Sequence, residues 1–306
     1  MSTSQTIRHL TRTEIDTAKW DGCIDRAENG RIYAYSTYLD AMCTNWDALV
    51  MGEYGAVMPL PWRKKYNISY IYYPAFAAQL GVFANNMSAD LVACFIAAIP
   101  KTFRYIDCPL NQGNVFSISS VPMMVRSNYV LDLSRPYASL ADGYRENIKR
   151  NIKKALSLRC TVVRDFPVER VVSLAKLQTV QSFITEEDFR RFQKLFYLLR
   201  NNRKAVTYGV HSPANELIAS CAFIFSHKRA YYIMVGNHPN GRTLGASHML
   251  IDAFVKDHAE KDLLLDFEGS DVRNLAFFYS SFGATEEKYA ALRLNRLPWY
   301  LRWLKN

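Results

Sequence analysis

One stretch of this chain, from Arg229 to Gly283, constrains its fold more than any other. It begins with a short apolar and aromatic run, Ala230 to Val235, which is followed by six residues dense in helix breakers, Gly236 to Gly241. Apolar positions spaced for a helix then run from about Leu244 to Ala259. A second apolar run, Leu263 to Phe267, ends around a carboxylate, and a further helix follows it. The order strand, loop, helix, strand, helix predicts an α/β unit whose Gly-rich loop and helix N-terminus are suited to hold a phosphate.

The same order of elements occurs twice in the chain. The pattern strand, turn, strand, loop, helix, strand extends from Ala56 to Asp107 and again from Ala219 to Asp266. Tyr72-Tyr73 in the first copy correspond to Tyr231-Tyr232 in the second, and the two terminal aspartates correspond at the same offset of 159 residues. A shared order of elements with matching anchors indicates a duplication. We therefore expect two tandem α/β domains, each with a central mixed sheet flanked by helices.

A basic helix is predicted between the two copies, over residues 139–158. Its apolar stripe would face a core, while Arg145, Lys149 and Lys153 follow one another at intervals of four residues on another face. This face is either the solvated side of a connecting helix or a contact for phosphate or an RNA backbone. We place the boundary before this helix, which gives an N-terminal domain 1–135 and a C-terminal domain 136–306.

Composition places the chain among soluble globular proteins. Of its 306 residues 49% are hydrophobic and 22% are charged, and the formal net charge is +10. The basic excess suggests an anionic partner such as a nucleotide, tRNA or a phosphorylated precursor, or only a surface that keeps the protein soluble. The six cysteines form no C-x-x-C pair, which is typical of free thiols in a reducing compartment. With no signal-peptide core and no apolar run of membrane-spanning length, we expect a cytoplasmic protein.

Three features of the opening stretch resemble the acyl-CoA N-acyltransferase fold of the Gcn5-related (GNAT) superfamily. Residues Arg242 to Ser247 are similar to the family's Q/R-x-x-G-x-G/A pyrophosphate loop, with Ser247 at the last position. A strand ends at Asp266 and is followed by a helix. Residues Asn274 to Gly283 look like the family's Asn…Ala…Tyr-x-x-x-Gly helix, with a shorter spacing between Asn and Tyr. The resemblance implies two tandem GNAT-like domains, the second of which carries the donor site.

Other segments resemble the duplicated branch that includes the FemABX peptidoglycan aminoacyltransferases. Asp266 to Ser270 is similar to that branch's D-F-G-G-S/T, Phe278 to Gly283 is similar to its F-K-x-x-F-G, and residues 129–155 look like the strand and basic helix that open its second domain. The lysine of F-K-x-x-F-G is Tyr279 here. In that branch the lysine is thought to stabilise charge during aminoacyl transfer. A tyrosine at this place instead resembles the ordinary N-acyltransferase residue that protonates a leaving thiolate.

The resemblance implies roles for particular residues in acyl transfer. Asp266 or Glu268, at the end of a strand, would accept a proton, and Tyr279 would act as a general acid. Each also has a structural interpretation, because the carboxylates could cap the next helix and Tyr279 could be a core aromatic. His248 lies within the predicted helix, and we interpret it as structural.

The donor and acceptor sites are predicted from the same comparison. A backbone N–H between Met234 and Gly236 would stabilise an oxyanion. The residues expected to bind the donor are Met234, Val235, Gly236, Arg242, Gly245, Ala246 and Ser247. The residues expected to bind the acceptor are Arg63, Lys64, Tyr73 and Gln79 of the first copy and His238 of the breaker-rich loop.

The sequence therefore favours transfer of an acyl group from a CoA thioester, such as acetyl-CoA, to an amine on a small molecule or a cell-wall precursor. One alternative is FemABX-type aminoacyl transfer from aminoacyl-tRNA to a peptidoglycan precursor. Another is a non-catalytic binding module that retains the fold. No cluster with metal-ligand spacing occurs, so we expect no metal, and the oligomeric state does not follow from the sequence.

Overall fold

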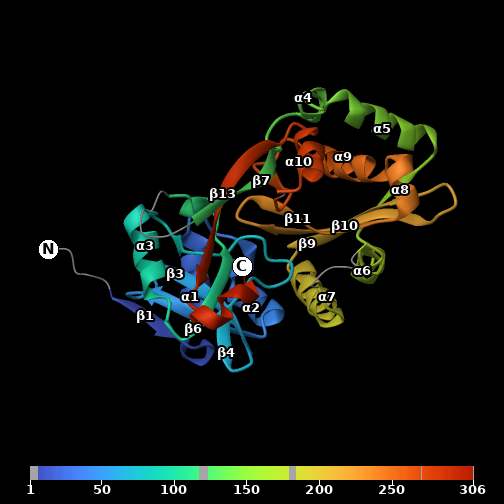
Figure 1. Cartoon of the computed structure of the whole chain (residues 1–306). Coiled ribbons are helices and arrows are strands. Elements are labelled where there is room, and N and C mark those ends of the chain that lie inside the picture. The colour runs from blue at the N-terminus through green and yellow to red at the C-terminus, as the bar shows by residue number, and fades with distance from the viewer. Residues whose placement is uncertain (1–5, 117–122, 179–183, 270, 306) are drawn as a thin grey trace. The chain divides into compact units, whose positions relative to one another are not determined.

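The computed structural model describes residues 6–116, 123–178, 184–269 and 271–305. The chain forms two compact units (Figure 1). Unit 1 consists of Met1–Arg126 and Lys288–Asn306, and unit 2 consists of Ser127–Glu287. The chain passes from one unit to the other within strand β7 (Met123–Asp132) and again within strand β13 (Thr285–Asn295). The roles predicted for domains 1–135 and 136–306 stay predictions.

Unit 1 is built on one mixed sheet. Its strands lie in the order β1-β2-β3-β4-β6-β13, and every pair is antiparallel except the parallel pair β4 and β6. Ser88 caps the helix before β6, since its hydroxyl accepts a hydrogen bond from Leu91 N at 3.1 Å. In chain order the elements are β1 (Ile7–Leu10), η1 (Arg12–Glu14), α1 (Thr17–Arg26), η2 (Ile32–Ala34), α2 (Ser36–Met42), β2 (Asn45–Met51), β3 (Ala56–Lys65), β4 (Ile68–Ile71), β5 (Phe83–Ala84), α3 (Ala89–Ala98), β6 (Phe103–Pro109), η3 (Gln112–Asn114) and, after β13, η4 (Trp299–Lys305).

Unit 2 repeats this plan in the order β8-β9-β10-β11-β12-β7, with β11 and β12 as its parallel pair. Helices cover both faces of its sheet: α6 and α7 lie on one side, and α8, α9 and α10 on the other (Figure 1). Its elements are α4 (Tyr137–Asp142), α5 (Glu146–Ser157), β8 (Thr161–Arg164), α6 (Val168–Lys176), α7 (Glu186–Asn201), β9 (Ala205–His211), β10 (Leu217–Ser226), β11 (Arg229–Asn237), α8 (Pro239–Leu244), α9 (Ala246–His258), β12 (Leu264–Asp266) and α10 (Arg273–Ser280).

The two units match in register as well as in order. In unit 1 Ile71 pairs with Ile106 across the parallel strands, and in unit 2 Tyr231 pairs with Asp266, so both partners lie 35 residues apart in the chain. In both units the last strand is antiparallel and comes from the other half of the sequence, β13 in unit 1 and β7 in unit 2. These matches support the predicted duplication, and the prediction of a mixed α/β fold is confirmed.

Two local predictions are wrong. The basic segment 139–158 is not one helix but two, α4 and α5, because the chain turns at Gly143 and the ring of Tyr144 is buried against Phe282 at 5.3 Å. The breaker-rich segment after β11 is not all loop, since it contains the short helix α8. This helix begins at Pro239, and proline suits the first position of a helix because its missing N–H would have no partner there.

The core of unit 2 lies between α9 and the sheet. Phe254 of α9 stacks on Phe223 of β10, with ring centroids 3.8 Å apart. All six cysteines of the chain are free thiols; five are buried, whereas Cys94 is exposed. Among the residues that the structure describes, no helix has the length and apolarity needed to cross a membrane.

Candidate functional site

A cavity of about 960 Å³ lies within unit 2, beside the end of β11. β11 pairs with β12 only as far as Tyr231, opposite Asp266, where β12 ends. β11 continues to Asn237 and carries a bulge at Ile233, since Tyr232 and Met234 face consecutive residues of β10. The described residues that line the cavity are Leu177, Gln178, Tyr232, Val235, Asn237, Pro239, Gly241, Ser247, His248, Asn274, Leu275, Phe278 and Tyr279. The free edge of β11, the first turn of α9 and one face of α10 therefore enclose a common space.

Tyr279 places a neutral phenol in this cavity. Its ring is buried and stacks on Phe267, with centroids 4.5 Å apart and an angle of 17° between the planes. Burial raises the pKa of Tyr279, and the neighbouring Cys221 and Glu268 raise it further. The hydroxyl is therefore protonated at neutral pH and is able to give a proton to a developing anion. This position fits the general-acid prediction for Tyr279, which stays a prediction.

His248 also lines the cavity, a location that the sequence did not indicate. It lies in the first turn of α9, and its ring meets Phe278 edge to face at 5.1 Å. Burial lowers the pKa of His248 to about 4, so the imidazole is neutral at physiological pH. The signal available in the sequence was a histidine near the start of a predicted helix, with a second predicted helix rich in phenylalanine further along the chain.

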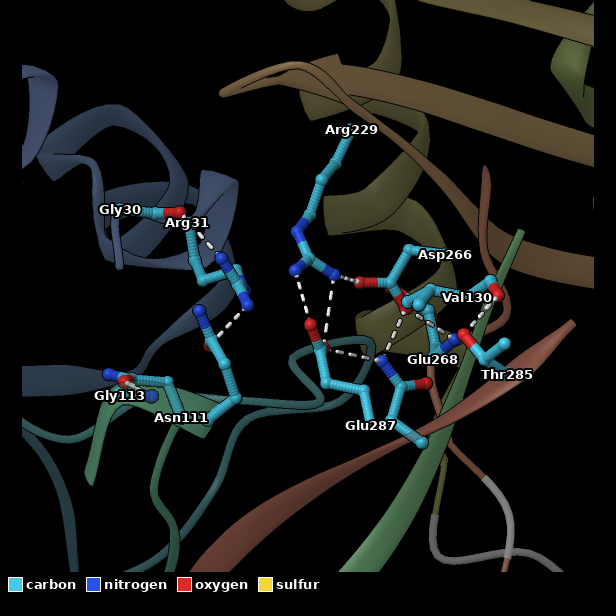
Figure 2. A network of polar contacts seen from close by, with 12 residues as sticks. Gly30, Arg31, Asn111, Gly113, Val130, Arg229, Asp266, Glu268, Thr285 and Glu287 are labelled. Atoms are coloured by element: carbon cyan, nitrogen blue, oxygen red, sulfur yellow. Dashed lines mark hydrogen bonds and ion pairs between the residues drawn. The ribbon is translucent and has the colours of Figure 1, made fainter. Parts of the chain in front are cut away.

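Asp266 lies in a buried polar network rather than in the cavity wall (Figure 2). Arg229 Nη1 donates to its carboxylate at 2.9 Å, and Asn128 Nδ2 and the backbone N of Glu268 donate at the same distance. The second guanidinium nitrogen of Arg229 pairs with Glu287 at 2.5 Å. The network joins β7, β11, β12 and β13 within unit 2. Three donors already occupy the Asp266 carboxylate, and the catalytic roles of Asp266 and Glu268 stay predictions.

The segment predicted to bind phosphate, Arg242 to Ser247, is packed tightly against neighbouring elements. Gly245 caps α9 in the left-handed conformation, with φ of +73°, and a Cβ there would stand 2.4 Å from the carbonyl oxygen of Asn151 in α5. Ala246 is fully buried, and Ser247 donates its hydroxyl hydrogen to Asn237 Oδ1 at 2.6 Å. The side chain of Arg242 lies outside the described residues.

The predicted oxyanion strand is only partly open to the cavity. Val235 lines it, whereas Met234 is buried. Gly236 supports the last turn of α6, because a Cβ on it would lie 2.7 Å from the backbone N of Ala175. Of the residues predicted to bind the donor, the structure thus brings Val235 and Ser247 to the cavity together with Tyr279, and packs the other described ones beside it.

The predicted acceptor residues divide between the two units. In unit 1 the guanidinium of Arg63 lies over the ring of Tyr72 at 4.2 Å, while Lys64 and Tyr73 are exposed. Gln79 is buried, and its side-chain oxygen has no hydrogen-bond partner within the described ranges. His238 belongs to unit 2, where its backbone N donates to Ile218 O at 3.0 Å.

The cations of α5 lie on a helix that packs against α9. Lys149 pairs with Glu146 at 3.6 Å. Arg150, Lys153 and Lys154 are exposed, and no ion pair joins them to any residue in the described part of the chain. Both interpretations of this face, a solvated surface and a contact for phosphate groups, are compatible with its exposure.

The repeated unit, with a splayed parallel strand pair beside a cavity, defines a duplicated N-acyltransferase-like fold. No protein-family model matches the sequence, and no curated protein does. Among solved structures, FemX is similar over 97% of this chain and 99% of its own, with 11% identity and a TM-score of 0.66. A tandem GNAT protein from the clavulanic acid biosynthesis pathway matches 96% of this chain and 99% of its own, with 14% identity and a TM-score of 0.56.

A third similar structure is the C-terminal DUF2156 domain of a putative lysylphosphatidylglycerol synthetase from Agrobacterium fabrum. It shares 9% identity over 92% of each chain, with a TM-score of 0.58. Identities this low establish the fold and not the reaction. The predicted resemblance is confirmed at that level: a GNAT-like fold extends over the whole chain, in two halves.

Proposed function

We propose that this protein transfers an acyl group from a CoA-type thioester, with acetyl-CoA as the simplest donor, to an amine. The observation that carries the proposal is the cavity of unit 2, in which a neutral phenol, Tyr279, lies beside the unpaired edge of a splayed strand. Acyl transfer requires little covalent chemistry from the protein, because its main tasks are orientation, stabilisation of an oxyanion and movement of protons. The cavity is large enough for a pantetheine arm.

Each part of the site has an expected role. A backbone N–H of β11 between Met234 and Gly236 stabilises the oxyanion, and Tyr279 protonates the leaving thiolate. The first turn of α9, from Gly245 to Ser247, and Arg242 bind the donor's phosphates. Glu268 accepts the proton of the amine, while Asp266 holds the end of β12 in place through its contacts with Arg229. The acceptor is a small amine or a cell-wall precursor, and the transfer takes place in the cytoplasm.

A second candidate is FemABX-type transfer from aminoacyl-tRNA. The whole-chain similarity to FemX favours it, as do the exposed cations Arg150, Lys153 and Lys154 of α5. Tyr279, in the place of that branch's lysine, disfavours it. A protein that binds a ligand without catalysis is the third candidate.

Binding experiments separate the three. Calorimetry and thermal shift should show that the protein binds acetyl-CoA and the non-reactive desulfo-CoA. Ser247→Trp, which fills the cavity, should abolish this binding, and Ala214→Trp on the exposed turn after β9 is the control. Binding of tRNA that falls steeply with salt, without binding of CoA, would favour the second candidate. If CoA thioesters neither bind nor raise the melting temperature, the CoA proposal is wrong.

A further inference from the structure

His248 has a position that its burial alone does not explain. It is the third residue of α9, and its ring lines the cavity and contacts two aromatic rings, Phe278 of α10 at 5.1 Å and Phe282 of the following turn at 6.4 Å. No described residue makes a hydrogen bond to either ring nitrogen. The residue is half-buried, so an imidazole whose nitrogens have no partner among the described residues and which lines a cavity is suited to meet a ligand there.

The cavity contains few other groups that could respond to charge. Among its described lining residues, the titratable side chains are Tyr232, His248 and Tyr279, and none is a carboxylate, an ammonium or a guanidinium. Asp252, one turn further along α9, accepts a hydrogen bond from Tyr137 instead. The two rings that contact the imidazole, Phe278 of α10 and Phe282 of the turn after it, are apolar. Because no cation is present among these lining residues, a negative charge that develops on a substrate has to be stabilised by neutral hydrogen-bond donors.

The protonation state of the imidazole decides whether it is suited to accept a proton or to donate a hydrogen bond. Its pKa of about 4 makes it a weak base, far from the value near the working pH that suits proton abstraction. The same low pKa keeps it neutral, and a neutral imidazole in the first turn of a helix is an effective hydrogen-bond donor to a carbonyl oxygen. The ring is therefore better suited to donate a hydrogen bond than to accept a proton.

We propose that His248 is a catalytic residue that donates a hydrogen bond to the carbonyl oxygen of the acyl donor. This inference rests on the proposed function. The amine nitrogen attacks the carbonyl carbon, a C–N bond forms, and the carbonyl electron pair moves to the oxygen, where His248 and β11 stabilise it. When that pair returns, the C–S bond breaks and the thiolate takes a proton from Tyr279. The amine loses one proton to Glu268 or water, and Tyr279 regains one from solvent.

Two substitutions test the role as donor. His248→Gln keeps an N–H donor, whereas His248→Leu removes it at similar volume. His248→Leu should lower kcat by about 10²–10³-fold with little change in KM, the range found when one oxyanion donor is removed. His248→Gln should recover at least tenfold of this loss. If His248→Gln is as slow as His248→Leu, or if His248→Leu is as fast as the wild type, the proposal is overturned.

A matched control is present on the same helix. His258 lies ten residues further along α9, about 15 Å away at 1.5 Å per residue. It is also partly buried with a lowered pKa, but it lies outside the cavity. His258→Leu should leave kcat and KM unchanged. Melting temperatures of all three variants exclude loss of folding as the cause of a slower reaction.

A readout on the bound donor does not require turnover. The infrared carbonyl stretch of acetyl-CoA, ¹³C-labelled at its carbonyl carbon, should lie at lower frequency in the wild type than in His248→Leu, because a hydrogen bond weakens the C=O bond. Equal frequencies with intact binding and transfer would overturn the role of His248 alone. If the wild type binds no acyl thioester, the proposed function fails, and this inference fails with it.

Discussion

The buried network around Arg229 predicts a large loss of stability when its only cation is replaced by an uncharged side chain. The Arg229 side chain is 7% exposed, and those of its partners Asp266 and Glu287 are 3% and 18% exposed. Burial alone would lower the pKa of Arg229, but the two carboxylates outweigh it and raise the pKa. The substitution Arg229→Met keeps the length of the side chain and removes the charge. It leaves two carboxylates in unit 2 facing each other without their shared cation.

The expected cost follows from this burial. Removing one partner of a buried ion pair destabilises a protein by about 3–5 kcal/mol, because the remaining charge keeps its desolvation penalty without the compensating attraction. For a unit of the size of unit 2, each kcal/mol lowers the melting temperature by about 2–4 °C. We therefore expect Arg229→Met to lower it by roughly 6–20 °C. A carboxylate deprived of its cation should also protonate more readily, so the loss should be smaller in acid.

The adjacent residue supplies the control. Lys228 pairs with Asp262 at 2.5 Å, but both side chains are more than 70% exposed. Exposed pairs of this kind are worth about 0–1 kcal/mol, so Lys228→Met should have little effect. The assay is thermal unfolding of the whole chain by calorimetry and circular dichroism. If the two substitutions lower the melting temperature equally, the network does not stabilise unit 2 and the argument from burial is wrong.

Further predictions concern the site and its surroundings. Tyr279→Phe should lower kcat by about 10²–10⁴-fold, the contribution of a general acid, while calorimetry shows unchanged donor binding. Gly236→Ala should cost about 1–3 kcal/mol in chemical denaturation, because its Cβ would lie 2.7 Å from the backbone of α6. The folded protein keeps His248 neutral down to pH about 4, so the melting temperature should fall between pH 6.5 and 4, and less so in His248→Gln. Burial raises the pKa of Cys23 to about 11, so at pH 8 iodoacetamide should modify the exposed Cys94 first, as peptide mass spectrometry would show.

The local elements could be predicted from sequence because local patterns determine them. The apolar spacing that predicts a helix over residues 244–259 corresponds to α9, Ala246–His258, and the aromatic run 230–235 corresponds to β11, Arg229–Asn237. The break between α4 and α5 could not be predicted in this way, since it depends on the burial of Tyr144 against Phe282, far along the chain. Long-range packing overrides a helical pattern that is continuous in the sequence.

The candidate site was predictable only in part, for the same reason. Tyr279 and Ser247 lie in short motifs, and the structure brings both to the cavity. A motif does not reveal partners, however: nothing near Asp266 in the sequence indicates that Arg229 and Asn128 occupy its carboxylate. His248 was interpreted as structural because the sequence of a helix does not show whether a histidine in it will line a cavity or have hydrogen-bond partners for its ring nitrogens.

The duplication itself argues for a donor site in unit 2. The parallel strand pairs of the two units match in register, but β4 ends at Ile71, where its pairing with β6 ends, whereas β11 continues six residues beyond Tyr231. In unit 1 the longer strand is instead β6, which runs to Pro109, where its carbonyl accepts a hydrogen bond from Leu80 N, whereas in unit 2 the continuing part of β11 lines the cavity. The aspartates differ too: Asp107 of unit 1 meets the exposed Arg293 at 3.2 Å, whereas Asp266 is buried against Arg229. Asp266 lies at the point where the pairing of β11 with β12 ends, which is where the cavity that we propose as the donor site begins.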